Sequence, residues 1–68
     1  MDIHEGLCYR INNRAGSFKD CGDHSTTKDR GKKVKALLCF DKLDVVQVLD
    51  LADSRSRFNV KKGCLDPL

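Results

Sequence analysis

The chain has 68 residues and a formal net charge of +3, and it is 40% hydrophobic and 34% charged. This length allows one domain at most, and the composition is typical of a small globule rather than a disordered segment. The longest uninterrupted apolar run, residues 36–40, is too short to span a membrane, and no basic region followed by an apolar run indicates a secretory signal. We therefore expect one soluble domain over residues 1–68, in the cytoplasm and without a membrane partner.

The first predicted element is a β-hairpin over residues 5–21. Apolar and polar residues alternate with the period of a half-buried strand, which points one set toward the core: Leu7, Tyr9 and Ile11. The turn residues Asn13–Gly16 follow, and a second short strand would begin at Ser17. A four-residue turn there would pair Ile11 with Phe18 and place Cys8 opposite Cys21.

Both histidines and two of the four cysteines fall in or beside this hairpin. Their spacing, His4-x3-Cys8 and Cys21-x2-His24 across twelve residues, resembles that of a C2H2 zinc site read backwards. The spacing has three interpretations: zinc bound by all four side chains, a Cys8–Cys21 disulfide, or surface histidines and reduced thiols. Zinc is the one cofactor for which the sequence offers ligands.

Residues 22–31 contain no hydrophobic side chain, so we expect a mobile surface loop there. Strands are predicted over residues 32–40, 44–51 and 57–61, and a tail over residues 64–68. In the first of these, alternation would point one set inward: Val34, Ala36, Leu38 and Phe40. The apolar spacing also fits a helix, so an α+β fold with a helix within residues 34–52 is the alternative.

About five short strands in one small domain predict a mainly β fold. We expect an antiparallel barrel or a strongly bent sheet, on the scale of SH3-like and OB-like barrels. The remaining cysteines, Cys39 and Cys64, are interpreted as a partly buried small hydrophobe and a thiol in the tail.

The sequence predicts no enzyme, because it contains no sheltered nucleophile and base and no glycine-rich phosphate-binding motif. No small-molecule substrate is indicated. We expect a protein-interaction module that pairs with a protein partner or with itself through exposed strand edges.

The alternative is a nucleic-acid-binding module that contacts the phosphate backbone. Basic residues gather in two stretches: residues 28–35 carry five basic groups and one acidic group, and residues 54–68 carry four and one. The four aromatic side chains are all expected in the core, which leaves backbone contact rather than base contact. The candidate contacts are Arg10, Lys19, Lys28, Arg30, Lys32, Lys33, Lys35, Arg55, Arg57, Lys61 and Lys62.

Overall fold

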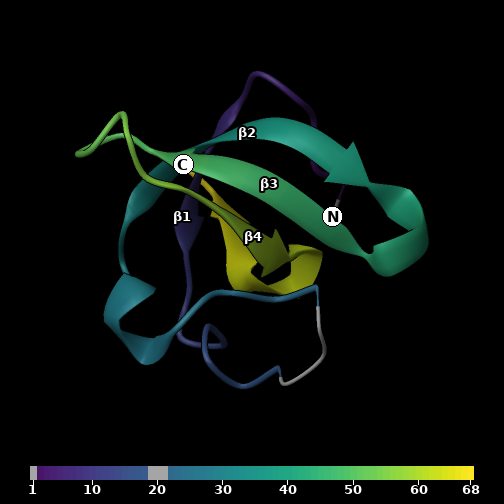
Figure 1. Ribbon diagram of the computed structural model, residues 1–68, viewed down its shortest axis with the longest axis horizontal. Helices are drawn as coiled ribbons and strands as arrows, with labels where there is room; N and C mark the ends of the chain where they lie inside the picture. The colour runs from purple at the N-terminus through teal and green to yellow at the C-terminus, as the bar shows by residue number, and fades with distance from the viewer. Residues whose placement is uncertain (1, 19–21) are drawn as a thin grey trace.

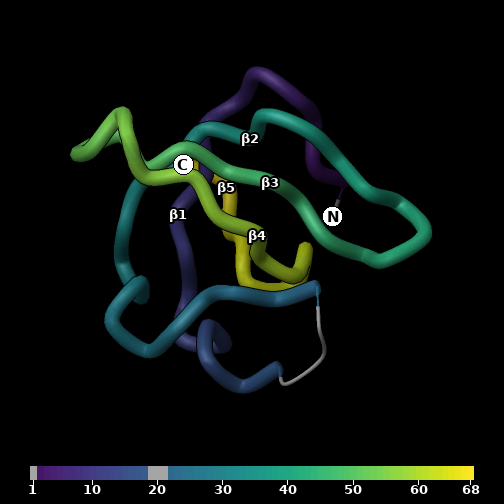
Figure 2. The backbone as a smooth tube through the Cα atoms, in the orientation of Figure 1, coloured from purple at the N-terminus to yellow at the C-terminus, as the bar shows by residue number. Residues whose placement is uncertain are grey.

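A computed structural model describes residues 2–18 and 22–68 of the chain. Its strands form one antiparallel sheet in the order β4-β3-β2-β1-β5 (Figures 1 and 2). The strands are β1 (Cys8–Ile11), β2 (Lys33–Phe40), β3 (Val45–Asp50), β4 (Arg57–Lys61) and β5 (Leu65–Pro67). Short 3-10 helices lie at η1 (Thr27–Asp29), η2 (Asp41–Leu43) and η3 (Lys62–Cys64). The mainly β prediction is confirmed, and the helix considered for residues 34–52 is wrong.

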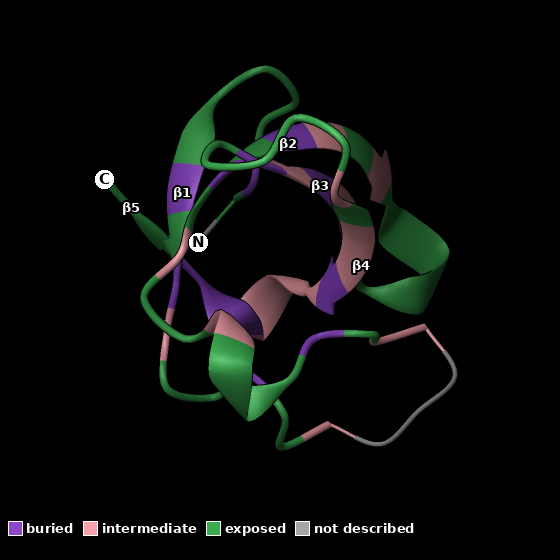
Figure 3. Cartoon of the chain, turned by 60° about the vertical axis from the view of Figure 1, so that its left-hand side comes forward, coloured by how far each residue is buried: buried purple, intermediate pink, exposed green. Residues whose placement is uncertain are grey.

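The sheet curls around a small core, so of the two expected shapes it is the bent sheet that forms (Figure 3). Strand β1, and β2 as far as Ala36, alternate exposed and buried residues as their pleat requires, whereas the consecutive residues Val45 and Val46 of β3 are both buried. The most deeply buried large side chains are Ile11, Leu65, Val34, Val45, Val46, Val48 and Val60. Phe18, Cys39 and Phe58 pack against the core from its margins. Within residues 2–18 and 22–68, no helix is long and apolar enough to cross a membrane.

The hairpin predicted over residues 5–21 is wrong in its pairing. Both edges of β1 are occupied by strands distant in sequence, because it pairs with β2 on one side and with β5 on the other. The turn itself forms, since the Ala15 N–H donates to Asn12 O and the Ser17 N–H to Arg14 O. Tyr9 and Ile11 are buried on the core face, as the alternation predicted, although the strands beside them are β2 and β5 rather than a local hairpin partner.

Strand β2 contains a β-bulge that the alternation did not predict. Its pairing with β3 runs Ala36↔Val48 and then Leu38↔Gln47, so Leu37 is the extra residue. An inserted residue reverses which face the following side chains occupy. Leu38 and Phe40 therefore point outward, with 46% and 36% exposed, although the alternation predicted both in the core.

The C-terminal segment is not a tail. Residues 62–64 form η3, which turns the chain from β4 toward β1, and residues 65–67 pair with β1 as β5. Cys64 and Leu65 are 0% and 2% exposed, so this segment completes the core. Leu7, expected inside, lies before β1 and is 54% exposed.

The apolar-free segment over residues 22–31 lies at the surface but is bonded to the sheet at two points. The His24 N–H donates to Asn59 O of β4, and the Gly31 N–H donates to Ile11 O at the end of β1. Its helix η1 begins with a capping box, in which Asp29 accepts a hydrogen bond from the Thr26 backbone at 2.7 Å. The mobility expected of this segment stays a prediction.

Candidate nucleic-acid interface

Four exposed basic side chains lie together on the outer face of the sheet. The strand register places Arg10 beside Lys33, and it aligns Lys35 with Leu49 and Leu49 with Arg57. Each of the four side chains points away from the core because its strand neighbours, such as Val34 and Ala36, point inward. We call Arg10, Lys33, Lys35 and Arg57 the basic face; it runs across strands β1 to β4.

The charges of the basic face are available to a ligand. Within the described part of the chain, none of the four side chains forms an ion pair or hydrogen bond. Asp66 lies opposite Arg10 in the register, but its carboxylate accepts a hydrogen bond from Asn12 Nδ2 at 3.1 Å instead. Like charges on adjacent strands repel one another, so a bound polyanion would relieve an unfavourable arrangement.

The other predicted basic contacts lie elsewhere. Lys61 shares the outer face four residues beyond Arg57, and its Nζ donates to Leu43 O at 3.0 Å. Arg30 Nε donates to Ala15 O, and Lys62 Nζ bonds the Asp41 carboxylate at 2.8 Å. Lys28 is exposed on η1 and Arg55 on the loop before β4, both outside the basic face, and Lys19 lies outside the described residues.

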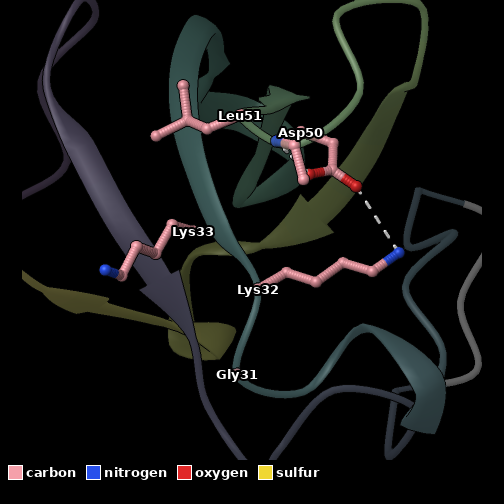
Figure 4. Close-up of a pocket in the computed structure, with 6 residues that line it drawn as sticks. Gly31, Lys32, Lys33, Asp50 and Leu51 are labelled. Carbon is pink, nitrogen blue, oxygen red and sulfur yellow. Dashed lines mark hydrogen bonds and ion pairs between the residues drawn. The ribbon is translucent and has the colours of Figure 1, made fainter.

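Lys32 and Lys33 are neighbours with different surroundings (Figure 4). Lys33 extends toward the outer face, whereas Lys32 extends the opposite way and its Nζ lies 3.6 Å from Asp50 Oδ2. Lys32 Nζ also bonds Asp29 Oδ1 at 2.9 Å and lies 6.0 Å from the centre of the Phe58 ring. Lys32 therefore closes one end of the core, between two carboxylates.

The ion pairs of Lys32 shift its proton equilibria. The hydrogen bond to Asp29 raises the Lys32 pKa above 10.5. Burial by itself would raise the pKa of Asp29, but the hydrogen bonds from Lys32 and Thr26 outweigh it and lower that pKa below 3.8. Both groups stay charged at neutral pH. The Lys32 ammonium is therefore engaged by carboxylates of the protein itself, and we do not include it in the basic face.

An open hollow of about 410 Å³ adjoins the basic face at Lys33. Its lining consists of Gly31, Lys32, Lys33, Asp50, Leu51 and Ala52. The backbone N–H groups of Gly31, Lys32, Leu51 and Ala52 are all donated to other protein atoms. These four amides are therefore not free to cradle a phosphate, and the hollow offers apolar walls with the charged groups of Lys32, Lys33 and Asp50.

The outer face carries an exposed apolar cluster at its far end, which the alternation along residues 32–40 does not predict. We use this name for Leu38, Phe40 and Leu43, which are 46%, 36% and 57% exposed. The bulge turns the first two outward, and η2 carries the third. The run from Ala36 to Phe40 contains no charged residue, so its alternation could not reveal where the bulge lies.

The predicted metal ligands are dispersed, as far as they are described. His4 lies before β1, and its backbone N–H donates to the Tyr9 hydroxyl; His24 lies along the edge of β4. Cys8 is exposed beside Lys35, and Cys21 lies outside the described residues. Within residues 2–18 and 22–68, no three His, Cys, Asp or Glu side chains gather as a metal site requires. Zinc binding stays a prediction.

The two remaining thiols are poor nucleophiles. Cys39 packs against the core, and burial followed by the charge of Glu5 raises its pKa above 9.0. Burial, followed by the charge of Asp23, likewise raises the pKa of the Cys64 thiol above 9.0, although a hydrogen bond with Ser25 acts in the opposite direction. A thiol must ionise to attack, so both shifts reduce reactivity at neutral pH.

Both outer strands of the sheet are poorly suited to pairing with another chain. Residue His24 already occupies a hydrogen-bonding position on β4, at Asn59. Strand β5 is three residues long and ends at Pro67, which has no N–H to donate.

Comparison of the chain with protein-family models, curated proteins and solved structures gives no match.

Proposed function

We propose that this domain is a non-enzymatic nucleic-acid-binding module whose basic face contacts the phosphate backbone. The observation that carries the proposal is the register: it makes four exposed cations neighbours on one surface, although they come from three separate parts of the sequence. Cations that contact phosphates displace condensed counterions, and this release drives binding without sequence recognition. A cytoplasmic location remains part of this proposal.

The proposal implies a defined salt dependence. Each phosphate contact contributes about −0.9 to the slope of log affinity against log salt for duplex DNA, and about −0.7 for single strands. Four contacts would therefore give a slope of roughly −3 to −4. The slope thus measures how many phosphate contacts form, and variants of matched charge test whether the basic face makes them.

The test uses two double variants that remove the same charge. Lys33→Ala/Lys35→Ala removes two cations from the basic face. The control, Lys28→Ala/Arg55→Ala, removes two exposed cations outside it, one on η1 and one on the loop before β4. Binding of both to single- and double-stranded oligonucleotides is measured by fluorescence anisotropy from 50 to 200 mM salt. We expect the first variant to weaken binding and to reduce the slope by about 1.4–1.8, and the control to change both much less. Equal losses in the two variants, or no salt-sensitive binding by the natural chain, would contradict the proposal.

A protein-interaction module is the second candidate, and the apolar cluster favours it. Exposed apolar side chains that adjoin one another often mark contact sites on small domains. Contact through this cluster is better supported than pairing through strand edges, given His24 on β4 and Pro67 on β5. Sedimentation at two concentrations tests self-association, and Leu43→Ser should reduce it; a monomer at both concentrations removes the homo-oligomeric version.

A further inference from the structure

The outer face of the sheet carries an exposed aromatic ring as well as cations. Phe40 lies on β2 five residues beyond Lys35, on the same face because of the bulge at Leu37. Its side chain is 36% exposed, and it lines an open hollow of about 400 Å³ together with Asp41, Lys42 and Leu43. The ring is thus accessible from the surface that bears the basic face.

We propose that the ligand of the basic face is a single-stranded nucleic acid and that one of its bases stacks on Phe40. This inference rests on the proposed function. Every base has a π-face that can stack on an aromatic side chain, so such contacts favour single strands without requiring a sequence. A duplex keeps its bases stacked on one another, and its outer surface offers Phe40 no base face.

The surroundings of Phe40 are compatible with an approaching strand. The Asp41 carboxylate on the adjoining turn is bonded to Lys62 Nζ at 2.8 Å, which offsets its repulsion of phosphate. Glu5 is also engaged, since its carboxylate accepts a hydrogen bond from the Cys39 N–H at 2.9 Å. Asp44 remains exposed there, and Lys42 is exposed on the same turn. Lys61 adds a third cation here, because its Nζ donates to Leu43 O at 3.0 Å. Three cations thus balance the three carboxylates, so this end is near neutral, which suits a base better than a phosphate.

Two amide side chains lie between the cations and the ring. Gln47 of β3 pairs with Leu38 on one side and with Asn59 of β4 on the other, so both amides belong to the outer face. Neither side chain forms a hydrogen bond within the described residues. An amide offers one acceptor and two donors, which matches the hydrogen-bonding edges of bases. Phosphates at the basic face, base edges at the amides and a base face at Phe40 form one continuous contact surface.

The experiment compares two substitutions at Phe40 on paired ligands. Phe40→Leu keeps an apolar side chain but removes the ring, and Phe40→Tyr keeps the ring as the matched control. Anisotropy is measured with an oligonucleotide as a single strand and as its duplex, with thermal melts to verify folding. We expect Phe40→Leu to weaken single-strand binding about five- to a hundredfold, and Phe40→Tyr to stay within about twofold. Duplex binding and the salt slope should not change, because neither depends on the ring.

The outcomes separate this inference from the proposed function. If Lys33→Ala/Lys35→Ala weakens binding but Phe40→Leu binds the single strand like the natural chain, the stacking inference is wrong and the proposed function stands. If the natural chain binds single strand and duplex with equal affinity, the stacking inference is likewise wrong and the proposed function stands. If Phe40→Leu leaves oligonucleotide binding intact but abolishes a concentration-dependent dimer, the ring is a protein contact and the inference is wrong. Absence of salt-sensitive binding overturns both.

Discussion

The two halves of β2 are both extended strand, but they place their large apolar side chains on opposite faces of the sheet. From Lys33 to Ala36 the apolar side chains point inward and the lysines point outward. Beyond the bulge Cys39 packs against the core, and the large apolar side chains of Leu38 and Phe40 are outside. One inserted residue therefore converts what would be a core-facing apolar run into an exposed apolar cluster. Hydrophobicity alone does not tell which half stabilises the fold.

The largest expected effect is on the free energy of unfolding, which should depend on one half of β2 far more than on the other. Val34→Ala removes two methyl groups at a site that is 0% exposed, whereas Leu38→Ala removes more atoms at a site that is 46% exposed. We expect the first to lower the free energy of unfolding by about 2 kcal/mol. The second should change it by less than about 0.5 kcal/mol. Urea unfolding of both variants measures this, and a larger loss for Leu38→Ala would mean that the bulge does not turn Leu38 outward.

A second pair of variants compares the ion pairs at the two ends of the β2–β3 hairpin. The Asp50 side chain is 8% exposed; it accepts a hydrogen bond from the Ala52 N–H and lies beside Lys32. Asp50→Ala leaves both groups without this partner, and we expect a loss of about 1–2 kcal/mol. At the other end Asp41 is 83% exposed beside Lys62, so Asp41→Ala should leave the melting temperature unchanged. Thermal melts at equal salt give both results, and similar losses would show that the exposed pair matters more than its burial implies.

The sequence predicts the number of strands better than it predicts their partners. The segments 32–40 and 57–61 are predictable because alternation and β-branched residues are local signals. The chain turns at residues 41–44 and 53–56, where the Asp44 N–H donates to Asp41 O and the Ser56 N–H donates to Asp53 O. The partners of β1 depend on contacts between distant segments, which a local turn at Asn13–Gly16 cannot reveal. The C-terminal strand was missed because three residues carry too little pattern to detect.

The candidate site also contains one part that the sequence predicts and one part that it does not. Lys33, Lys35 and Arg57 were predicted as phosphate contacts, and simple alternation places all three on the outer face, because the bulge comes after Lys35 and does not involve β4. Phe40 was expected in the core, and only the register between β2 and β3 shows that it lies outside. A charged residue in a strand therefore indicates which face of the sheet is exposed, whereas an unbroken run of apolar residues does not.

The reactivity of two cysteines measures the change of sheet face that the bulge causes in β2. Cys8 is exposed opposite Lys35, and Cys39 packs against the core beyond the bulge, where burial raises its pKa. We expect iodoacetamide to alkylate Cys8 at least about tenfold faster than Cys39 at pH 8, because the thiolate must be both formed and accessible. Peptide mapping by mass spectrometry resolves the sites. Regular alternation along β2 would instead expose Cys39, and the two rates would then be similar.

The smallest expected effect concerns acid. The pKa of Asp29 is lowered in the folded state, so this carboxylate stabilises the fold at pH values well above 3.8 and loses that contribution as the pH falls toward its folded pKa. Asp29→Asn should therefore reduce stability at pH 7 and make the melting temperature less sensitive to pH below about 4. Melting curves from pH 7 to pH 2.5 test this, with Asp41→Asn as the control because its carboxylate is 83% exposed. If both variants follow the pH dependence of the natural chain, the contact between Asp29 and Lys32 does not anchor the basic end of β2. In that case the difference between the two halves of the strand depends on the packing of Val34 and Ala36 alone.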